Sequence, residues 1–140
     1  MRENSPSYID EALEMGFDVE VDLWVGDTGQ IGLGHDDLTY QLDTPWFQRR
    51  STKLWIHCKN SKAINFAQSL GLNYFFHDTD NYTLTSQGFV WVFPGETPVG
   101  RSIVLDIAGF ARPGTTQLGN AYGICSDWAQ DLKFALNSDA

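Results

Sequence analysis

Short apolar runs, separated by polar or glycine- and proline-containing stretches, form the main pattern of the chain. After Ser5-Pro6, the residues Ile9, Ala12 and Leu13 recur at helical spacing, which predicts a helix that ends at Gly16. Similar signals predict further helices over residues 46–50, 62–70 and 127–136. Apolar, β-rich runs predict strands over residues 18–25, 31–34, 53–58, 73–77, 89–93, 102–106 and 122–125. The polar segment 83–86 predicts a turn, and the Gly- and Pro-rich residues 107–119 predict a loop.

The order of these elements indicates the fold class. Strands alternate with helices in the first part of the chain, and several strands are apolar throughout, as expected when both faces of a sheet are buried. We therefore expect an α/β fold with about seven mostly parallel strands. The 140 residues fit a single domain over 1–140, with short or missing helices in its second half.

Polar residues gather just after the predicted strands. Because parallel strands present their carboxyl ends at one edge of a sheet, these residues are expected to share that edge, as in a β/α barrel or an open α/β sheet. These polar residues are Asp22, His35-Asp36, His57 with Lys59-Asn60, His77-Asp78 and Ser126-Asp127. They include all three histidines of the chain.

An acid pair stands in the predicted strand 18–25. Glu20 and Asp22 are two residues apart, so their side chains point to one face of the strand while its apolar residues point to the other. Two neighbouring carboxylates on an apolar strand are costly unless they are compensated, and a divalent cation is the usual partner. We favour a metal site, and the alternative is a solvated strand face.

The histidines allow functional and structural interpretations. His35 suits acid–base catalysis because imidazole titrates near neutrality, and its alternative role is a turn residue hydrogen-bonded to Asp36. For His57, a structural role at the end of the core and a role as metal ligand fit the sequence equally well. For His77, the two roles are lining a pocket and structural packing. Lys59, at a strand end, binds phosphate or offsets acidic charge, and the alternative is a salt bridge to the acid pair.

Composition narrows the class of partner. The net charge of −9 argues against binding nucleic acid through phosphate contacts. Cys58 and Cys125 form no Cys-x-x-Cys pair, so we expect two small apolar residues in a reduced compartment. Neither a membrane-spanning apolar run nor a signal peptide is evident, which predicts a soluble, cytoplasmic protein without membrane insertion.

Several segments together resemble a known enzyme family. NSPSYIDEAL, GFDVEVDLW and LGHD, with LWIHCKN, TLTS and GICSD further along, are similar to glycerophosphodiester phosphodiesterases of the phospholipase-C-like phosphodiesterase superfamily. The resemblance covers residues 3–127. Its members are TIM-type β/α barrels that use a divalent metal ion and acid–base histidines to cleave a phosphodiester. The resemblance thus implies a truncated TIM-type barrel and a metal-dependent hydrolase of a small phosphodiester.

The resemblance also implies roles for individual residues. Glu20 and Asp22 match the metal-binding Glu-x-Asp of the family, and His35 matches its catalytic histidine. Lys59, expected to be catalytic, matches the lysine of a Glu-x-Lys motif in which His57 replaces the usual metal-binding glutamate. The implied cofactor is Mg²⁺ or Ca²⁺, with Mn²⁺ as a further option, and an imidazole ligand favours softer ions over Ca²⁺.

Further features of the site follow less directly from the resemblance. Glu3 and Asn4 match the Glu-Asn that precedes the first helix of the family. Asn60, which is also expected to cap a helix, and His77 are expected to contact the substrate.

The chain departs from the family at its amino terminus. Family members place a strand ending in His-Arg-Gly before the Glu-Asn, and no such strand precedes Glu3 here. The predicted barrel therefore has an open edge, which we expect to close differently or to pair with a second copy of the chain. One alternative function is a catalytically impaired relative that binds metal or phosphate or acts as an oligomeric interaction module. Another interpretation is that a longer gene encodes His-Arg-Gly upstream of Met1.

Overall fold

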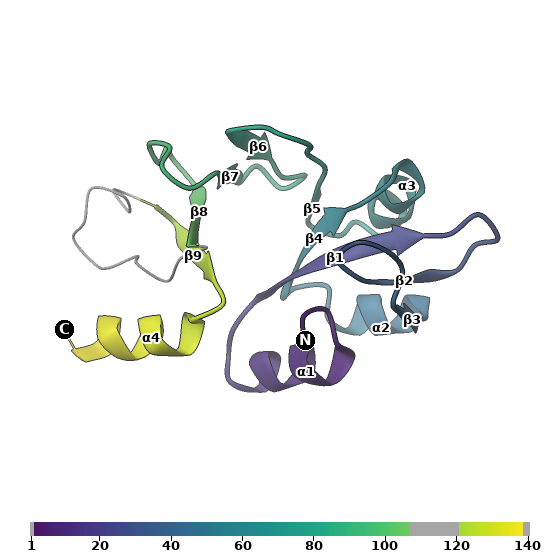
Figure 1. Cartoon of the computed structure of the whole chain (residues 1–140), viewed down its shortest axis with the longest axis horizontal. Helices are drawn as coiled ribbons and strands as arrows, with labels where there is room; N and C mark the ends of the chain where they lie inside the picture. The colour runs from purple at the N-terminus through teal and green to yellow at the C-terminus, as the bar shows by residue number, and fades with distance from the viewer. Residues whose placement is uncertain (1, 107–120, 139–140) are drawn as a thin grey trace. The chain divides into compact units, whose positions relative to one another are not determined.

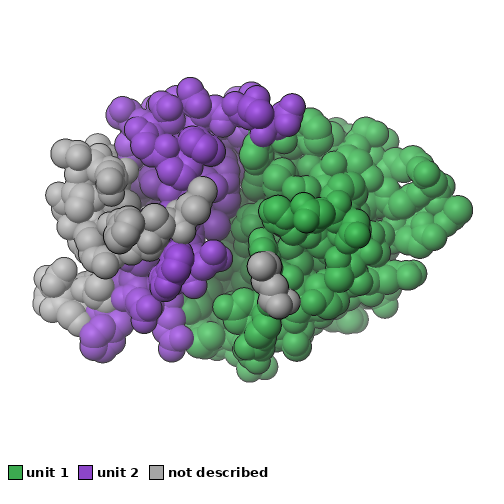
Figure 2. All heavy atoms as spheres, in the orientation of Figure 1, with its two compact units in different colours: residues 1–77 green, residues 78–140 purple. Residues whose placement is uncertain are grey.

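The computed structural model describes residues 2–106 and 121–138. The chain forms two compact units, residues 1–77 and residues 78–140 (Figure 2). Each unit has its own β-sheet, which can be followed in Figure 1. Within the described ranges, no helix has both the length and the apolar character needed to cross a membrane.

The first unit is built on a five-stranded sheet with the order β3-β2-β1-β4-β5. Strands β1, β4 and β5 run parallel, and β2 and β3 add to β1 in antiparallel fashion. The strands are β1 (Val19–Val25), β2 (Ile31–Leu33), β3 (Tyr40–Leu42), β4 (Leu54–Cys58) and β5 (Tyr74–Phe75), and the helices are α1 (Pro6–Glu14), α2 (Thr44–Arg49) and α3 (Ser61–Ser69).

The second unit holds a four-stranded sheet with the order β6-β7-β8-β9. Strands β7, β8 and β9 run parallel, and β6 pairs with β7 in antiparallel fashion. Its elements are β6 (Tyr82–Leu84), β7 (Val90–Val92), β8 (Ser102–Asp106), β9 (Gly123–Ser126) and α4 (Ala129–Ser138). The loop predicted over residues 107–119 lies outside the described residues.

The predicted α/β class is confirmed, and the predicted truncated barrel is not. The structure shows two mixed sheets, and neither closes into a barrel within the described residues. One reason is that residues 26–30 join β1 to β2, and so short a connection makes an antiparallel hairpin, because a parallel pair needs a crossover of roughly a dozen residues. Strand β3 was not predicted. The turn predicted over residues 83–86 is confirmed only in its second half: Thr83 and Leu84 belong to β6, and the N–H of Gly88 closes a turn on the carbonyl oxygen of Thr85.

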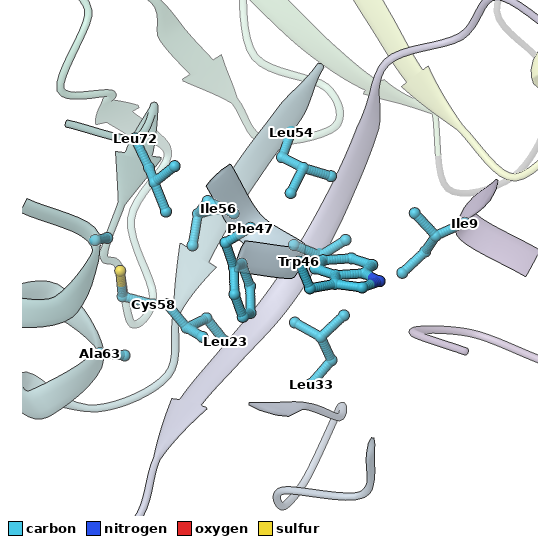
Figure 3. Packing of buried hydrophobic residues seen from close by; sticks show 12 residues of the cluster. Ile9, Leu23, Leu33, Trp46, Phe47, Leu54, Ile56, Cys58, Ala63 and Leu72 are labelled. Carbon is cyan, nitrogen blue, oxygen red and sulfur yellow. The ribbon is translucent and has the colours of Figure 1, made fainter. Parts of the chain in front are cut away.

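The core of the first unit positions the acid pair. Val21 and Leu23 of β1 are fully buried, so alternation along the strand sends Glu20 and Asp22 to the opposite face. Phe47 of α2 is also fully buried, and its ring packs edge-on against that of Trp46 at 5.0 Å (Figure 3). Both rings belong to the same buried cluster as Val21 and Leu23, which supports β1 from the face away from the carboxylates.

The predicted apolar role of the cysteines can be followed at Cys58, which has a free thiol. Cys58, at the end of β4, is fully buried in the core of the first unit. Burial raises the pKa of its thiol to about 12, so Cys58 is a neutral, apolar packing residue.

Candidate metal centre

Strand register brings three metal-ligating side chains together. In the parallel ladder of β1 and β4, Asp22 is the direct partner of His57, and Glu20 precedes Asp22 on the same face. Nδ1 of His57 lies 3.1 Å from Oδ1 of Asp22 and 3.8 Å from Oε1 of Glu20. One ligand atom from each of the three residues lies within 4.8 Å of the other two. This spacing lets a single divalent ion contact all three.

The three side chains are sheltered but reachable. The exposed fraction is 6% for the Asp22 side chain, 15% for His57 and 25% for Glu20. Two carboxylates and one imidazole form a donor set that suits Mn²⁺ and related divalent ions, and three protein ligands leave coordination positions for water or substrate. The residues present therefore fit a divalent ion.

The electrostatics of the acid pair also favour a cation. Burial raises the pKa of Glu20 well above its usual range, and the negative charges of Asp22 and Glu3 raise it further, against a smaller opposing effect of Lys59. Burial also acts to raise the pKa of Asp22, but hydrogen bonds from His57 and Asn4 and the positive charges of His57 and Lys59 outweigh it, so that pKa is lowered. Asp22 is thus kept ionised, while Glu20 needs a nearby cation to ionise at low cost.

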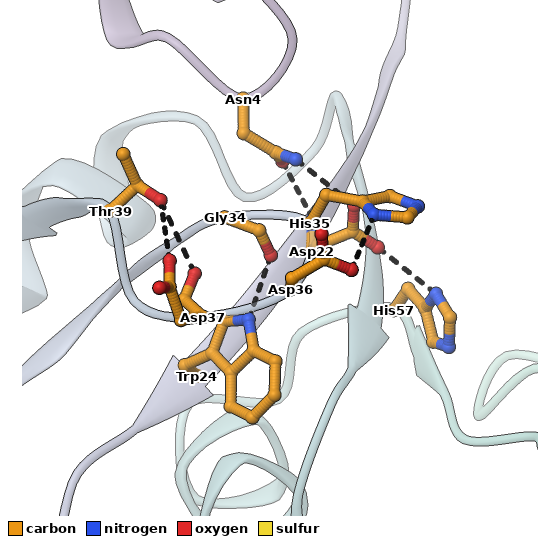
Figure 4. Close-up of polar contacts among 9 residues, drawn as sticks. All are labelled: Asn4, Asp22, Trp24, Gly34, His35, Asp36, Asp37, Thr39 and His57. Carbon is orange, nitrogen blue, oxygen red and sulfur yellow. Dashed lines mark hydrogen bonds and ion pairs between the residues drawn. The ribbon is translucent and has the colours of Figure 1, made fainter.

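Asn4 holds Asp22 from the side opposite β4. Its Nδ2 donates to Oδ2 of Asp22 at 3.0 Å, and its Oδ1 accepts from the backbone N–H of Asp22 at 2.9 Å (Figure 4). Asn4 is buried and has a left-handed backbone, with φ of 63°. The sequence resemblance singled out Asn4 without giving it a role. Its contact with Asp22, 18 positions further along the chain, leaves no periodic signal in the sequence.

The ring of His57 belongs to an aromatic stack. His57 stacks on His77 at 4.5 Å between ring centroids and on Phe75 at 5.1 Å, with interplanar angles of 12° in both cases. The stack fixes the plane of the imidazole. The structure therefore brings His77, predicted to contact the substrate, to the site as a ring partner of His57.

His35 lies on the segment that follows β2. The backbone N–H of Gly34 donates to the carbonyl oxygen of Asp22 at 3.1 Å, and Nε1 of Trp24 donates to the carbonyl oxygen of Gly34 at 2.7 Å. This pair of bonds fixes the start of the turn beside β1. The His35 side chain is largely exposed, and its Nδ1 lies 3.0 Å from Oδ1 of Asp36 (Figure 4).

Lys59 and Asn60 follow β4, as predicted. The backbone N–H of Lys59 donates to the carbonyl oxygen of Leu23 at 2.9 Å, and the Lys59 ammonium acts to lower the pKa of both site carboxylates, against the larger effects that raise that of Glu20. Asn60 caps α3, since its Oδ1 accepts from the N–H of Ala63 and its Nδ2 donates to the carbonyl oxygen of Val25, both at 2.9 Å. The expected cap is confirmed, and the substrate contact of Asn60 stays a prediction.

Comparison of the chain with models of protein families, with curated protein sequences and with solved structures finds no match. The resemblance to glycerophosphodiester phosphodiesterases, with the activity that it implies, therefore stays a prediction. The geometry of Glu20, Asp22 and His57 stands independently of it.

Proposed function

We propose that the chain binds a divalent cation through Glu20, Asp22 and His57 and uses it to hydrolyse a small phosphodiester. The observation that carries the proposal is the convergence of three ligand atoms within 4.8 Å on one face of two adjacent parallel strands. The phosphodiester class comes from the sequence resemblance alone. Mn²⁺ suits the mixed oxygen and nitrogen donors best, Mg²⁺ follows, and Ca²⁺ suits them least because it prefers an all-oxygen shell.

A bound cation would supply charge stabilisation for a non-bridging phosphate oxygen. Lys59 adds positive charge near the same carboxylates, as its effect on their pKa values indicates. Asp36 accepts a hydrogen bond at Nδ1 of His35, which leaves Nε2 of His35 to take or give a proton. His35 would thus serve the attacking or leaving oxygen in this proposal.

Metal binding is the first test. Isothermal titration with Mn²⁺ should show a single saturable site in the parent chain and a large loss of affinity in Glu20→Gln and Asp22→Asn. Asp27→Asn is the matched control, because it removes the same charge from an exposed carboxylate that pairs with Lys62 at 2.8 Å. Absence of Mn²⁺ binding by the folded parent chain would refute the proposal.

Turnover is the second test. Hydrolysis of bis(p-nitrophenyl) phosphate and of glycerophosphodiesters should require Mn²⁺ or Mg²⁺ and should be lost in His35→Ala while Mn²⁺ affinity is retained. A competing function, a metal-binding module without turnover, is favoured by the stacking of the other two histidines, His57 and His77, which ties His77 to the ligand ring. Mn²⁺ binding without hydrolysis of any tested diester would support that module over the hydrolase.

A further inference from the structure

We infer that Asn4 is a positioning residue that orients the carboxylate of Asp22 for metal binding. The inference rests on the proposed metal site and adds to it a residue that lies outside the three ligands. Asn4 precedes α1, which Ser5 caps by accepting from the N–H of Tyr8. Its side chain reaches β1 and contacts Asp22 through both of its polar atoms (Figure 4).

One of the two hydrogen bonds gives the oxygens of the Asp22 carboxylate different partners. Nδ2 of Asn4 donates to Oδ2, while Oδ1 lies 3.1 Å from Nδ1 of His57, another of the three candidate ligands. With Oδ2 held by an amide, Asp22 presents Oδ1 as a single ligand atom. The second bond, from the Asp22 N–H to Oδ1 of Asn4, fixes the amide against the strand, so the orientation cannot relax by rotation of the asparagine.

The backbone of Asn4 supports a role beyond chain packing. A left-handed φ of 63° is uncommon outside glycine, and asparagine is among the residues that tolerate it. Ser5, next along the chain, is extended and caps α1 by itself, so the helix start does not need the asparagine side chain. A non-glycine residue thus stands here in a sparsely populated conformation, and its side chain contacts a proposed metal ligand.

The test compares Mn²⁺ dissociation constants of the parent chain, Asn4→Gly and Ser5→Ala by isothermal titration. Glycine keeps the left-handed backbone at no steric cost and removes both hydrogen bonds. Its Mn²⁺ dissociation constant should rise about ten- to a hundredfold, the usual effect of losing an outer-shell partner of a ligand. Ser5→Ala weakens the same segment without touching Asp22, and its dissociation constant should stay within about twofold of the parent value, well below that effect.

A spectroscopic measurement separates positioning from general loosening. The visible absorption of the Co²⁺-loaded protein reports coordination geometry, and it should change in Asn4→Gly because the freed carboxylate can bind through both oxygens. Ser5→Ala should keep the parent spectrum. Asn4→Ser, whose shorter side chain cannot make both hydrogen bonds, replaces the glycine variant if that variant does not fold, and its Mn²⁺ affinity should likewise fall below that of the parent chain.

The outcomes are distinct. An Asn4→Gly chain that binds Mn²⁺ as the parent does overturns the inference and leaves the proposed metal site standing. Equal losses in Asn4→Gly and Ser5→Ala, with unchanged Co²⁺ spectra, also overturn it, because the segment would then act only through folding. A folded parent chain that binds no Mn²⁺ overturns the inference and the proposed function together.

Discussion

Replacing Asn60 by alanine should destabilise the fold without weakening the metal site. The Asn60 side chain makes two hydrogen bonds of 2.9 Å, one to the N–H of Ala63 at the start of α3 and one to the carbonyl oxygen of Val25 at the end of β1. Loss of an N-cap costs about 1 kcal/mol. Loss of the partner of a half-buried carbonyl costs roughly 1 kcal/mol more. We therefore expect Asn60→Ala to lower the free energy of unfolding by about 2 kcal/mol.

Urea unfolding followed by circular dichroism measures this change. The variant Asn60→Asp separates the contribution of the cap from that of the bond to Val25. Aspartate keeps the oxygen that caps α3 but cannot donate to Val25, so it should lose about 1 kcal/mol. Mn²⁺ affinity per folded molecule should match the parent chain in both variants. A parental free energy of unfolding in Asn60→Ala would refute the argument. A raised KM in Asn60→Ala would support the separate expectation that Asn60 contacts the substrate.

Two further predictions concern the turn that follows β2 and the acid pair. An added Cβ at Gly34 would overlap the carbonyl oxygen of Asp37, so Gly34→Ala should lower Tm and reduce turnover by displacing His35; parental values of both would contradict this. Because the pKa of Glu20 is raised in the folded chain, its contribution to stability is fully present at pH values below the ordinary glutamate pKa. That contribution is lost as the pH rises through the raised pKa. Added Mn²⁺ should offset that loss, so the rise in Tm that Mn²⁺ causes in thermal unfolding should grow with pH. A rise in Tm that does not change with pH, or that grows as steeply in Glu20→Gln, would refute the assignment of Glu20 as a metal ligand.

The helices of this chain are encoded locally, and the sequence predicts them well. The α2 helix begins after Asp43, whose side chain accepts from the N–H of Trp46 at 3.0 Å, and Pro45 stands in its first turn. Ser5-Pro6 and Asn60 give similar signals for α1 and α3. Each signal lies within a few residues of the helix that it starts, so no distant contact is needed to interpret it.

The missed strands depend on partners elsewhere in the chain. Strands β3 and β6 are edge strands of three residues each, and the side chain of Leu84 in β6 is mostly exposed. Their formation comes from pairing with β2 and β7, which composition alone does not indicate. The predicted barrel was not confirmed for a related reason, because single-strand patterns do not tell which strands pair or in which direction.

In the candidate site, too, some features follow from local sequence and others depend on distant partners. The spacing of Glu20 and Asp22 follows from alternation along one strand and is readable in the sequence. The approach of His57 depends on the β1–β4 register, which pairs it with Asp22, 35 positions earlier in the chain. The Asn4 contact depends on a left-handed backbone. The sequence therefore indicates the acids, and the pairing of strands supplies their partners.

The parallel ladder between β1 and β4 gives the metal site a second consequence. An ion held by Glu20 and Asp22 on one strand and His57 on the next would cross-link the two strands at a fixed register. Opening that ladder would then require the ion to dissociate first. Amide protons of β1 and β4 should consequently exchange more slowly with deuterated solvent when Mn²⁺ is present, while those of β7 and β8 in the second unit keep their rates.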